Sequence, residues 1–186
     1  MQTPLKKTLT LTFAFILLLA ACTGRPSSSG TTLIPYNDPG GIFSMTYPDG
    51  WSVIYDQALN SVTFAPEGQA DTRFPLSVKA IAVKTASDAW DEAGEEINQV
   101  LAQFLKSFFP DESPEVYNTS DLTVGRQPAL VMDFAKPFDN GYYKGSIVLV
   151  ILRGYAIGFV GGSDGETWDA FLPTFKQMLL DVTFNQ

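Results

Sequence analysis

The segment from residue 147 to residue 152 constrains the fold more than any other part of this 186-residue chain. It reads Ile-Val-Leu-Val-Ile-Leu, so it is apolar on both faces of an extended strand. Because successive side chains of a strand point to opposite faces, such a strand belongs in the middle of a sheet that is covered on both sides. The chain therefore needs strands on either side of this one and further elements that cover both faces.

Other segments can supply those strands. Alternating apolar residues bounded by turn residues predict strands at 42–47, 51–55, 61–65, 75–83, 115–122, 127–135, 142–152 and 155–160. The sequences Pro48-Asp49-Gly50, Asp139-Asn140-Gly141 and Arg153-Gly154 are typical of tight turns and favour antiparallel pairing. Gly161-Gly162 is expected to turn the chain from the last strand into a helix.

Two helices are predicted. At Ser87 the apolar period changes from two to 3.6, which predicts a long amphipathic helix with Ser87 as N-cap and Pro110 at its end. A second helix is predicted after the capping-box sequence 163–166, with a kink at Pro173 or a main helix that starts near Leu172. The expected fold class is α+β, a mostly antiparallel β-sheet sandwiched by helices, in the order four strands, helix, four strands, helix.

The N-terminus has the features of a secretory signal. Lys6 and Lys7 precede an uncharged apolar run that is well short of the ~20 residues of a membrane-spanning helix. The run ends in Leu19-Ala20-Ala21-Cys22, which resembles the lipobox of bacterial lipoproteins. The resemblance implies cleavage after Ala21 and acylation of Cys22, the only cysteine; the alternative is an ordinary signal peptide with an incidental cysteine.

This interpretation predicts three regions. Residues 1–21 are the signal peptide, and residues 22–41, rich in Ser, Thr, Gly and Pro, form a flexible tether that starts at the lipidated cysteine. Residues 42–186 form one domain. The lipid on Cys22 would attach the protein to a bacterial membrane on an extracytoplasmic side, at the cell surface or on the periplasmic or thylakoid-lumen face.

The composition excludes several classes of function. Loss of Lys6 and Lys7 with the signal peptide leaves ten basic residues against twenty acidic ones, so no nucleic-acid partner is expected. The chain has no histidine, which removes the commonest general base and the commonest transition-metal ligand. A lipidated Cys22 would leave no thiol for a disulfide, a nucleophile or a zinc site.

Several acidic and glycine-rich sequences were weighed as sites. Glu92, Glu95 and Glu96 share a helix face that can hold Ca²⁺ or Mg²⁺ weakly, although a solvated face explains them, as it does the acidic loop 111–115. The glycines around 158–165 fit neither a P-loop nor a dinucleotide fingerprint. We therefore expect no catalytic residue, no metal site and no cofactor. Asp133, a charge inside an apolar strand, is the best candidate for an enzyme with an all-carboxylate site.

The domain resembles the PsbP family of the Mog1/PsbP/DcrB-like fold. The resemblance rests on the segment 43–51, Phe-Ser-Met-Thr-Tyr-Pro-Asp-Gly-Trp, and on the closing helix, and its structural residues are Pro48, Gly50, Trp51, Trp168 and Pro173. It implies an extrinsic domain that docks on a membrane complex and is not an enzyme. Family members with metal sites use histidines, which this chain lacks.

The leading hypothesis is a non-catalytic, membrane-anchored lipoprotein whose domain docks on, or assists assembly of, another membrane or envelope protein complex. The alternative is a lipoprotein that binds a small molecule or a divalent cation in a pocket between sheet and helix, lined by phenylalanines and tyrosines.

Overall fold

The computed structural model describes residues 31–69, 75–89, 93–109, 114–139 and 141–185. The expected signal peptide, Ala21 and Cys22 lie outside the described residues. The elements are, in chain order, β1 (Leu33–Asn37), β2 (Phe43–Pro48), β3 (Trp51–Asp56), β4 (Ser61–Pro66), β5 (Ser77–Lys84), α2 (Glu96–Phe108), β6 (Glu115–Val124), β7 (Gln127–Phe138), β8 (Gly141–Leu152), β9 (Tyr155–Asp164), α3 (Gly165–Leu180) and β10 (Thr183–Phe184).

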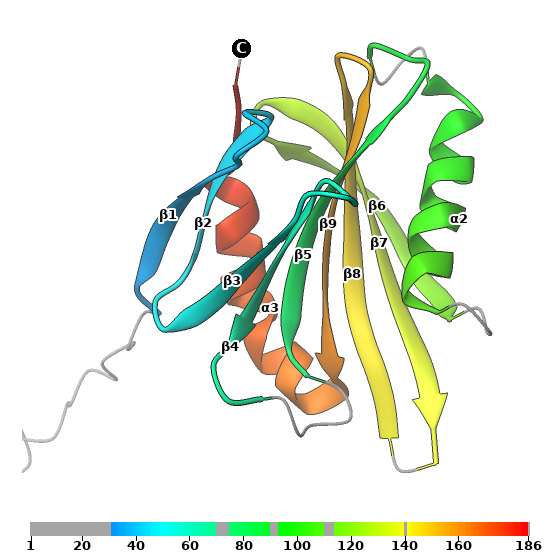
Figure 1. Cartoon of the computed structure of the whole chain (residues 1–186). Coiled ribbons are helices and arrows are strands. Elements are labelled where there is room, and N and C mark those ends of the chain that lie inside the picture. The colour runs from blue at the N-terminus through cyan, green and yellow to red at the C-terminus, as the bar shows by residue number, and fades with distance from the viewer. Residues whose placement is uncertain (1–30, 70–74, 90–92, 110–113, 140, 186) are drawn as a thin grey trace, which may run out of the picture. The chain divides into compact units, whose positions relative to one another are not determined.

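The strands form two antiparallel sheets (Figure 1). The larger has seven strands in the order β3-β4-β5-β9-β8-β7-β6, and the smaller has three in the order β1-β2-β10. The hairpins β7–β8 and β8–β9 pair as their turn sequences predicted. The predicted α+β class with a large antiparallel sheet is confirmed.

Strand β8 is an interior strand that is covered on both faces, as the apolar segment predicted, next to β9 in the middle of the sheet. It pairs with β7 on one side and with β9 on the other. Ile147, Leu149 and Ile151 belong to one hydrophobic core, whereas Val148 and Val150 belong to a second core on the opposite face. All five are at most 2% exposed.

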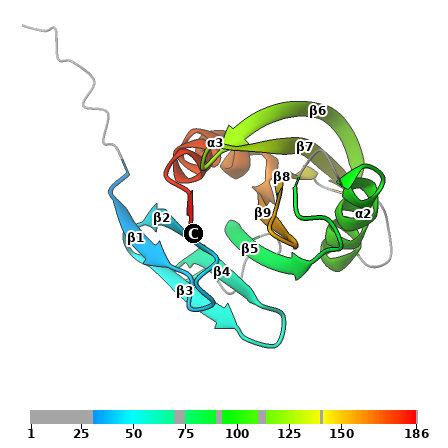
Figure 2. The ribbon, with the colours of Figure 1, turned by 90° about the horizontal axis from the view of Figure 1, so that it is seen from above.

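Each core is closed by a different helix. Helix α2 covers one face through Val100, Leu101 and Phe104. Helix α3 covers the other face through Trp168, Phe175 and Met178, together with the small sheet. Figure 2 shows α3 and α2 on opposite sides of β8. The expected element order was wrong, because β1 precedes the predicted strands, β10 follows the last helix, and both pair with β2 outside the main sheet.

Strand β1 lies inside the segment that we expected to be a flexible tether. It pairs with β2 from Leu33 opposite Pro48 to Asn37 opposite Ser44, and Leu33 and Tyr36 pack against the core. The ordered domain therefore begins before residue 42. The apolar residues of β1 were hidden in the sequence by the Pro, Asn and Gly residues around them.

Helix α2 begins at Glu96, so the expected N-cap at Ser87 was wrong. Gly94 takes φ +43, outside the right-handed helical region, and this separates the preceding residues from α2. The Ser87 hydroxyl instead donates to the Glu96 carboxylate over 2.6 Å. Trp90, Asp91, Glu92 and Pro110, which the sequence placed on or at the end of this helix, lie outside the described residues.

Strand β9 runs to Asp164, so Gly161 and Gly162 are strand residues and not the turn that we expected. A β-carbon on Gly161 would lie 2.5 Å from Cη2 of Trp168, and one on Gly162 would overlap the Tyr143 hydroxyl. These glycines therefore allow aromatic rings to approach the strand backbone from the helix and from the neighbouring strand.

Helix α3 starts at Gly165 and continues through Pro173 to Leu180. Of the two alternatives, a main helix that starts near Leu172 was wrong, and the N-cap is Asp164 instead of Ser163. Pro173 lies on the exposed side of the helix, where water can satisfy the carbonyl that the missing N–H leaves free. Ser163 is buried in β9 and is 1% exposed.

Candidate functional site

A groove of about 390 Å³ lies between helix α3 and the three strands β6, β7 and β8. The strands contribute its floor and α3 contributes one wall. Its lining residues are Asn118, Ser120, Asp121, Leu122, Thr123, Val131, Asp133, Ser146, Val148, Leu172, Phe175, Lys176, Leu179 and Leu180. The groove lies between sheet and helix, as the ligand-binding alternative expected, but among the described lining residues Phe175 is the only aromatic one.

A row of three polar side chains crosses the floor of this groove. Asn118 on β6 lies opposite Asp133 on β7, and Asp133 lies opposite Ser146 on β8. Asn118 Nδ2 donates to Asp133 Oδ2 over 2.7 Å, and Ser146 Oγ donates to Asp133 Oδ1 over 2.5 Å. Directly opposed residues on neighbouring strands point to the same face, which is why three residues far apart in the chain converge.

The remainder of the floor and the wall is largely apolar. The next row of the sheet places Ser120, Val131 and Val148 side by side. Phe175 and Leu179 of α3 face them and are buried, whereas Leu122 and Leu180 are 38% and 68% exposed. The groove thus combines a polar row of hydrogen-bonding groups with an apolar channel that is open to solvent.

Asp133 is the carboxylate on the floor of the groove, and Lys176 is the basic residue in its helical wall. Asp121 also borders the groove, but it lies opposite Leu130, so its side chain points to the other face of the sheet. Within the described part of the chain, no basic side chain forms an ion pair with Asp133, and its hydrogen-bond donors are both neutral. The arrangement can therefore receive a cationic group without displacing a cation already bound by the protein.

The surroundings of Asp133 differ from those that the enzyme hypothesis requires. That hypothesis required several carboxylates, but Asp133 is held between an amide and a hydroxyl. Across the described residues, no group of three His, Cys, Asp or Glu side chains is placed to hold a metal ion.

The acidic helix face weighed as a cation site has another role in the structure. The Glu96 carboxylate accepts hydrogen bonds from the Ser87 hydroxyl and from the Ala86 N–H, the latter over 2.9 Å. These two bonds, the first above all, lower the pKa of Glu96 below its ordinary value. Glu96 therefore joins the segment after β5 to the start of α2.

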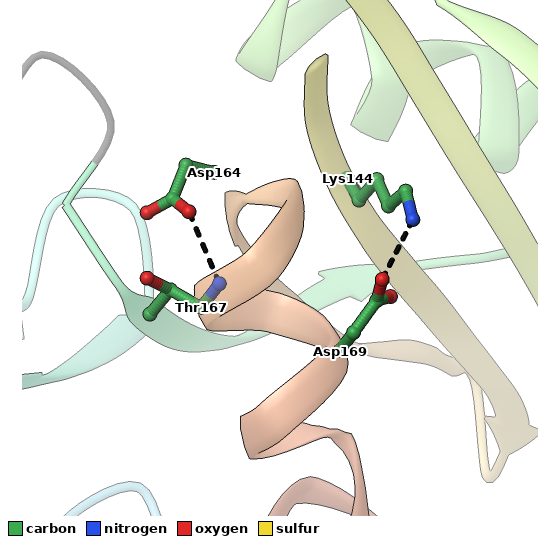
Figure 3. A network of polar contacts seen from close by, with 4 residues as sticks. All are labelled: Lys144, Asp164, Thr167 and Asp169. Atoms are coloured by element: carbon green, nitrogen blue, oxygen red, sulfur yellow. Dashed lines mark hydrogen bonds and ion pairs between the residues drawn. The ribbon is translucent and has the colours of Figure 1, made fainter. Parts of the chain in front are cut away.

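A second polar cluster lies at the start of α3 (Figure 3). Asp164 Oδ1 accepts from the Thr167 N–H over 3.0 Å, and this bond, with one from the Thr167 side chain, lowers the pKa of Asp164. On the same helix, Asp169 pairs with Lys144 of β8 over 2.8 Å. Both side chains of that pair are accessible to water, so the pair contributes little to stability; together with Asp164 and Glu166 they line a second, open pocket of about 370 Å³.

The residues of the family resemblance occupy structural positions. Pro48 is buried at the end of β2, and Gly50 takes φ +78 in the following turn. Trp51 is partly exposed and stacks on Phe171, with ring centroids 5.1 Å apart and planes at 23°. Trp168 is 2% exposed and lies in the core beneath α3.

The sequence reasoning missed two members of the polar row and the basic residue beside it. The sequence patterns gave Asn118 no role in a site, and Ser146 lies within the strand predicted at 142–152. A single polar residue that continues the face of Val148 and Val150 is a signal that could have identified Ser146. No local pattern in β6 identifies Asn118, because its role follows from its register with Asp133.

Comparison with known proteins shows that the fold is similar to that of solved structures. No protein-family model and no curated protein matches the sequence. The solution structure of cyanobacterial PsbP (CyanoP) from Synechocystis sp. PCC 6803 matches with a TM-score of 0.63 and 16% identity, over 85% of this chain and 95% of that one. The chain has a PsbP-like fold.

A second match extends this fold to another bacterial protein. The crystal structure of LpqN, which is involved in cell envelope biogenesis of Mycobacterium tuberculosis, matches with a TM-score of 0.56 and 12% identity, over 84% of this chain and 92% of that one. The resemblance to the PsbP-like fold that the sequence indicated is thus confirmed. No helix within the described residues is long and apolar enough to cross a membrane.

Proposed function

We propose that this protein is a non-catalytic lipoprotein, anchored through Cys22 on an extracytoplasmic membrane face, whose PsbP-like domain docks on another membrane or envelope protein complex or assists its assembly. Its partners are then the membrane, through the lipid, and a protein, with no nucleic acid involved.

The observation that carries this proposal is the fold shared with CyanoP and with LpqN, a protein of cell envelope biogenesis, in a chain that also has the lipobox-like sequence 19–22. The absence of histidine from the sequence and the arrangement around Asp133 support a role without catalysis.

An apolar edge of the main sheet offers a surface for such docking. Strand β3 is the first strand of the seven-stranded sheet, so one of its backbone edges has no partner within that sheet. Ile54 is 63% exposed and Leu59, in the turn that follows, is 55% exposed. A strand of a partner protein can pair with this edge and cover these side chains.

The test is cross-linking of the tagged protein in its native membrane, followed by identification of the attached proteins. We expect one partner with the anchored form and loss of that partner with a Cys22→Ala form. Ile54→Lys should weaken the cross-link, whereas Val116→Lys, an exposed apolar position on the opposite edge strand β6, should not. Recovery of no partner above the Cys22→Ala background would refute the docking function.

Ligand binding is a second candidate function, and the groove beside α3 favours it. The polar row and the apolar channel together match the usual composition of small-molecule sites. An organic ligand suits these groups better than a divalent cation, because Asp133 shares the row with an amide and a hydroxyl and not with other carboxylates. Thermal-shift measurements with organic ligands and, separately, with Ca²⁺ and Mg²⁺ distinguish binding of a small molecule from binding of a divalent cation.

A further inference from the structure

We infer that the groove between α3 and strands β6–β8 binds a small molecule with a compact cationic head, such as a protonated amine, and an apolar tail. The inference rests on the second candidate function, ligand binding, and is independent of docking through β3.

The cationic head is assigned by the surroundings of Asp133. A carboxylate has about four lone-pair positions, and the two hydrogen bonds from Asn118 and Ser146 occupy two of them. Ser146 is 2% exposed and Asp133 is partly buried, so the carboxylate faces the groove with limited hydration. A partly buried carboxylate that accepts hydrogen bonds only from neutral groups is stabilised most by a cation. The cation donates hydrogen bonds to the lone-pair positions that are still open.

The charge of the chain as a whole favours the same kind of ligand. Asp121 also borders the groove, but it lies opposite Leu130 and its side chain points to the other face of the sheet, so Asp133 is the carboxylate of the floor and Lys176 is the basic residue of the helical wall among the described lining residues. The chain as a whole has a net charge of −8, so the surrounding potential also attracts cations. A fatty acid or another anionic amphiphile would meet repulsion at the polar row.

The apolar tail is assigned by the exposed side chains at the mouth of the groove. Leu122 of β6 and Leu180 of α3 line the groove and are 38% and 68% exposed, and both are among the large apolar side chains most accessible to solvent in the described residues. Beneath them lie Val131, Val148 and Phe175. An aliphatic or aromatic tail placed there covers apolar surface on both walls.

The dimensions suit a small ligand and not a folded partner. The volume of about 390 Å³ lies toward the lower end of the range for ligand pockets, which is about 300–1,000 Å³. The floor is formed by three paired strands and the wall by a helix that packs on them, so the site exists before the ligand binds.

The experiment is calorimetric titration of the purified protein with n-octylamine, n-octanol and n-octanoate, which share one tail and differ in head charge. We expect octylamine to bind about tenfold or more tightly than octanol, since its ammonium group forms a charge-assisted hydrogen bond with the Asp133 carboxylate, and octanoate to bind most weakly. Asp133→Asn should remove the preference for octylamine but leave octanol binding unchanged.

Two further variants distinguish the contribution of the cationic head to binding from that of the apolar tail. Leu180→Ser, at an exposed position, should weaken octylamine and octanol by similar factors. Asp139→Asn removes an exposed carboxylate near the far end of the same strand, outside the groove lining, and should change nothing. Circular dichroism and melting temperature verify that each variant is folded.

The outcomes are distinguishable. Binding of octanol or octanoate as tightly as octylamine, or an unchanged preference in Asp133→Asn, would overturn the cationic head and leave a ligand-binding groove in place. If none of the three probes bound, both the inference and the ligand-binding function would fail, whereas the cross-linking experiment would still decide the docking function.

Discussion

Trp168 packs so closely against the backbone of Gly161 that a β-carbon at residue 161 would lie 2.5 Å from its Cη2 atom. Phe175 is the next ring, and its Cε2 atom would lie 3.2 Å from the same β-carbon. The approach brings α3 onto β9 and closes the core on this face of the sheet.

Gly161→Ala should therefore destabilise the protein. The added methyl group forces Trp168 or the strand to move, and overpacking of this kind costs about 1–3 kcal/mol of the free energy of unfolding. Urea unfolding monitored by tryptophan fluorescence measures the change. The control is Gly165→Ala, where the nearest atom to a β-carbon is Lys144 Cε at 3.4 Å; a loss of stability as large at residue 165 would contradict the steric explanation.

Asp164 should stabilise the start of α3 through its side chain. Removal of the N-cap in Asp164→Ala is expected to cost about 1 kcal/mol, because the Thr167 N–H loses its acceptor. Asp164→Asn retains an acceptor and should cost less. Thermal or urea unfolding at neutral pH gives both values, and equal losses in the two variants would show that the hydrogen bond is not what matters.

The same residue should make stability depend on pH in the acid range. The bonds from Thr167 lower the pKa of Asp164 below its ordinary value of 3.8, so the folded state favours the ionised form. Its contribution is complete above pH 3.8 and is lost as the pH falls through the lower, folded-state pKa. Melting temperatures of Asp164→Asn should consequently fall less steeply than those of the wild type below about pH 4.

Tyr143 should produce the opposite dependence at alkaline pH. Burial raises its pKa to about 12, so the folded state disfavours the phenolate. Its contribution to stability is present below the ordinary pKa of 10 and is lost as the pH rises from 10 toward 12. Tyr143→Phe should show a smaller decrease in melting temperature over this range than the wild type. Tyr142→Phe, at a neighbouring side chain that is 57% exposed, should follow the wild type.

Ser146→Ala should destabilise the groove floor. The buried Ser146 hydroxyl donates to Asp133, and removal of one partner from a buried polar pair costs about 1–3 kcal/mol. Ser120→Ala, at an exposed serine of the same groove, should change stability by less than about 0.5 kcal/mol. If both substitutions proved neutral, the polar row would not contribute to the stability of the sheet.

Much of the fold was available from periodicity. The segment 51–55 was predicted as a strand and is β3, the alternation at 61–65 gives β4, and the run 147–152 lies in the interior of the sheet. These predictions succeeded because burial of one face or of both faces leaves a local pattern in the sequence. Turn residues likewise determine which neighbours pair, as at Arg153-Gly154 between β8 and β9.

Other features depend on contacts between distant residues. The placement of Gly161 within a strand follows from the ring of Trp168 above it, and the pairing of β1 and β10 with β2 joins segments from the two ends of the domain. Neither the position of Gly161 nor the pairing with β2 leaves a periodic pattern in the sequence, because each depends on contacts with a distant element.

The sequence alone thus determined the class of fold, the doubly covered strand and the antiparallel hairpins. Only the tertiary structure decided the second sheet and the role of the glycines, and only it brought Asn118, Asp133 and Ser146 together. The physical reason is that alternation along a strand specifies a face, but the register between strands specifies which side chains on that face are neighbours.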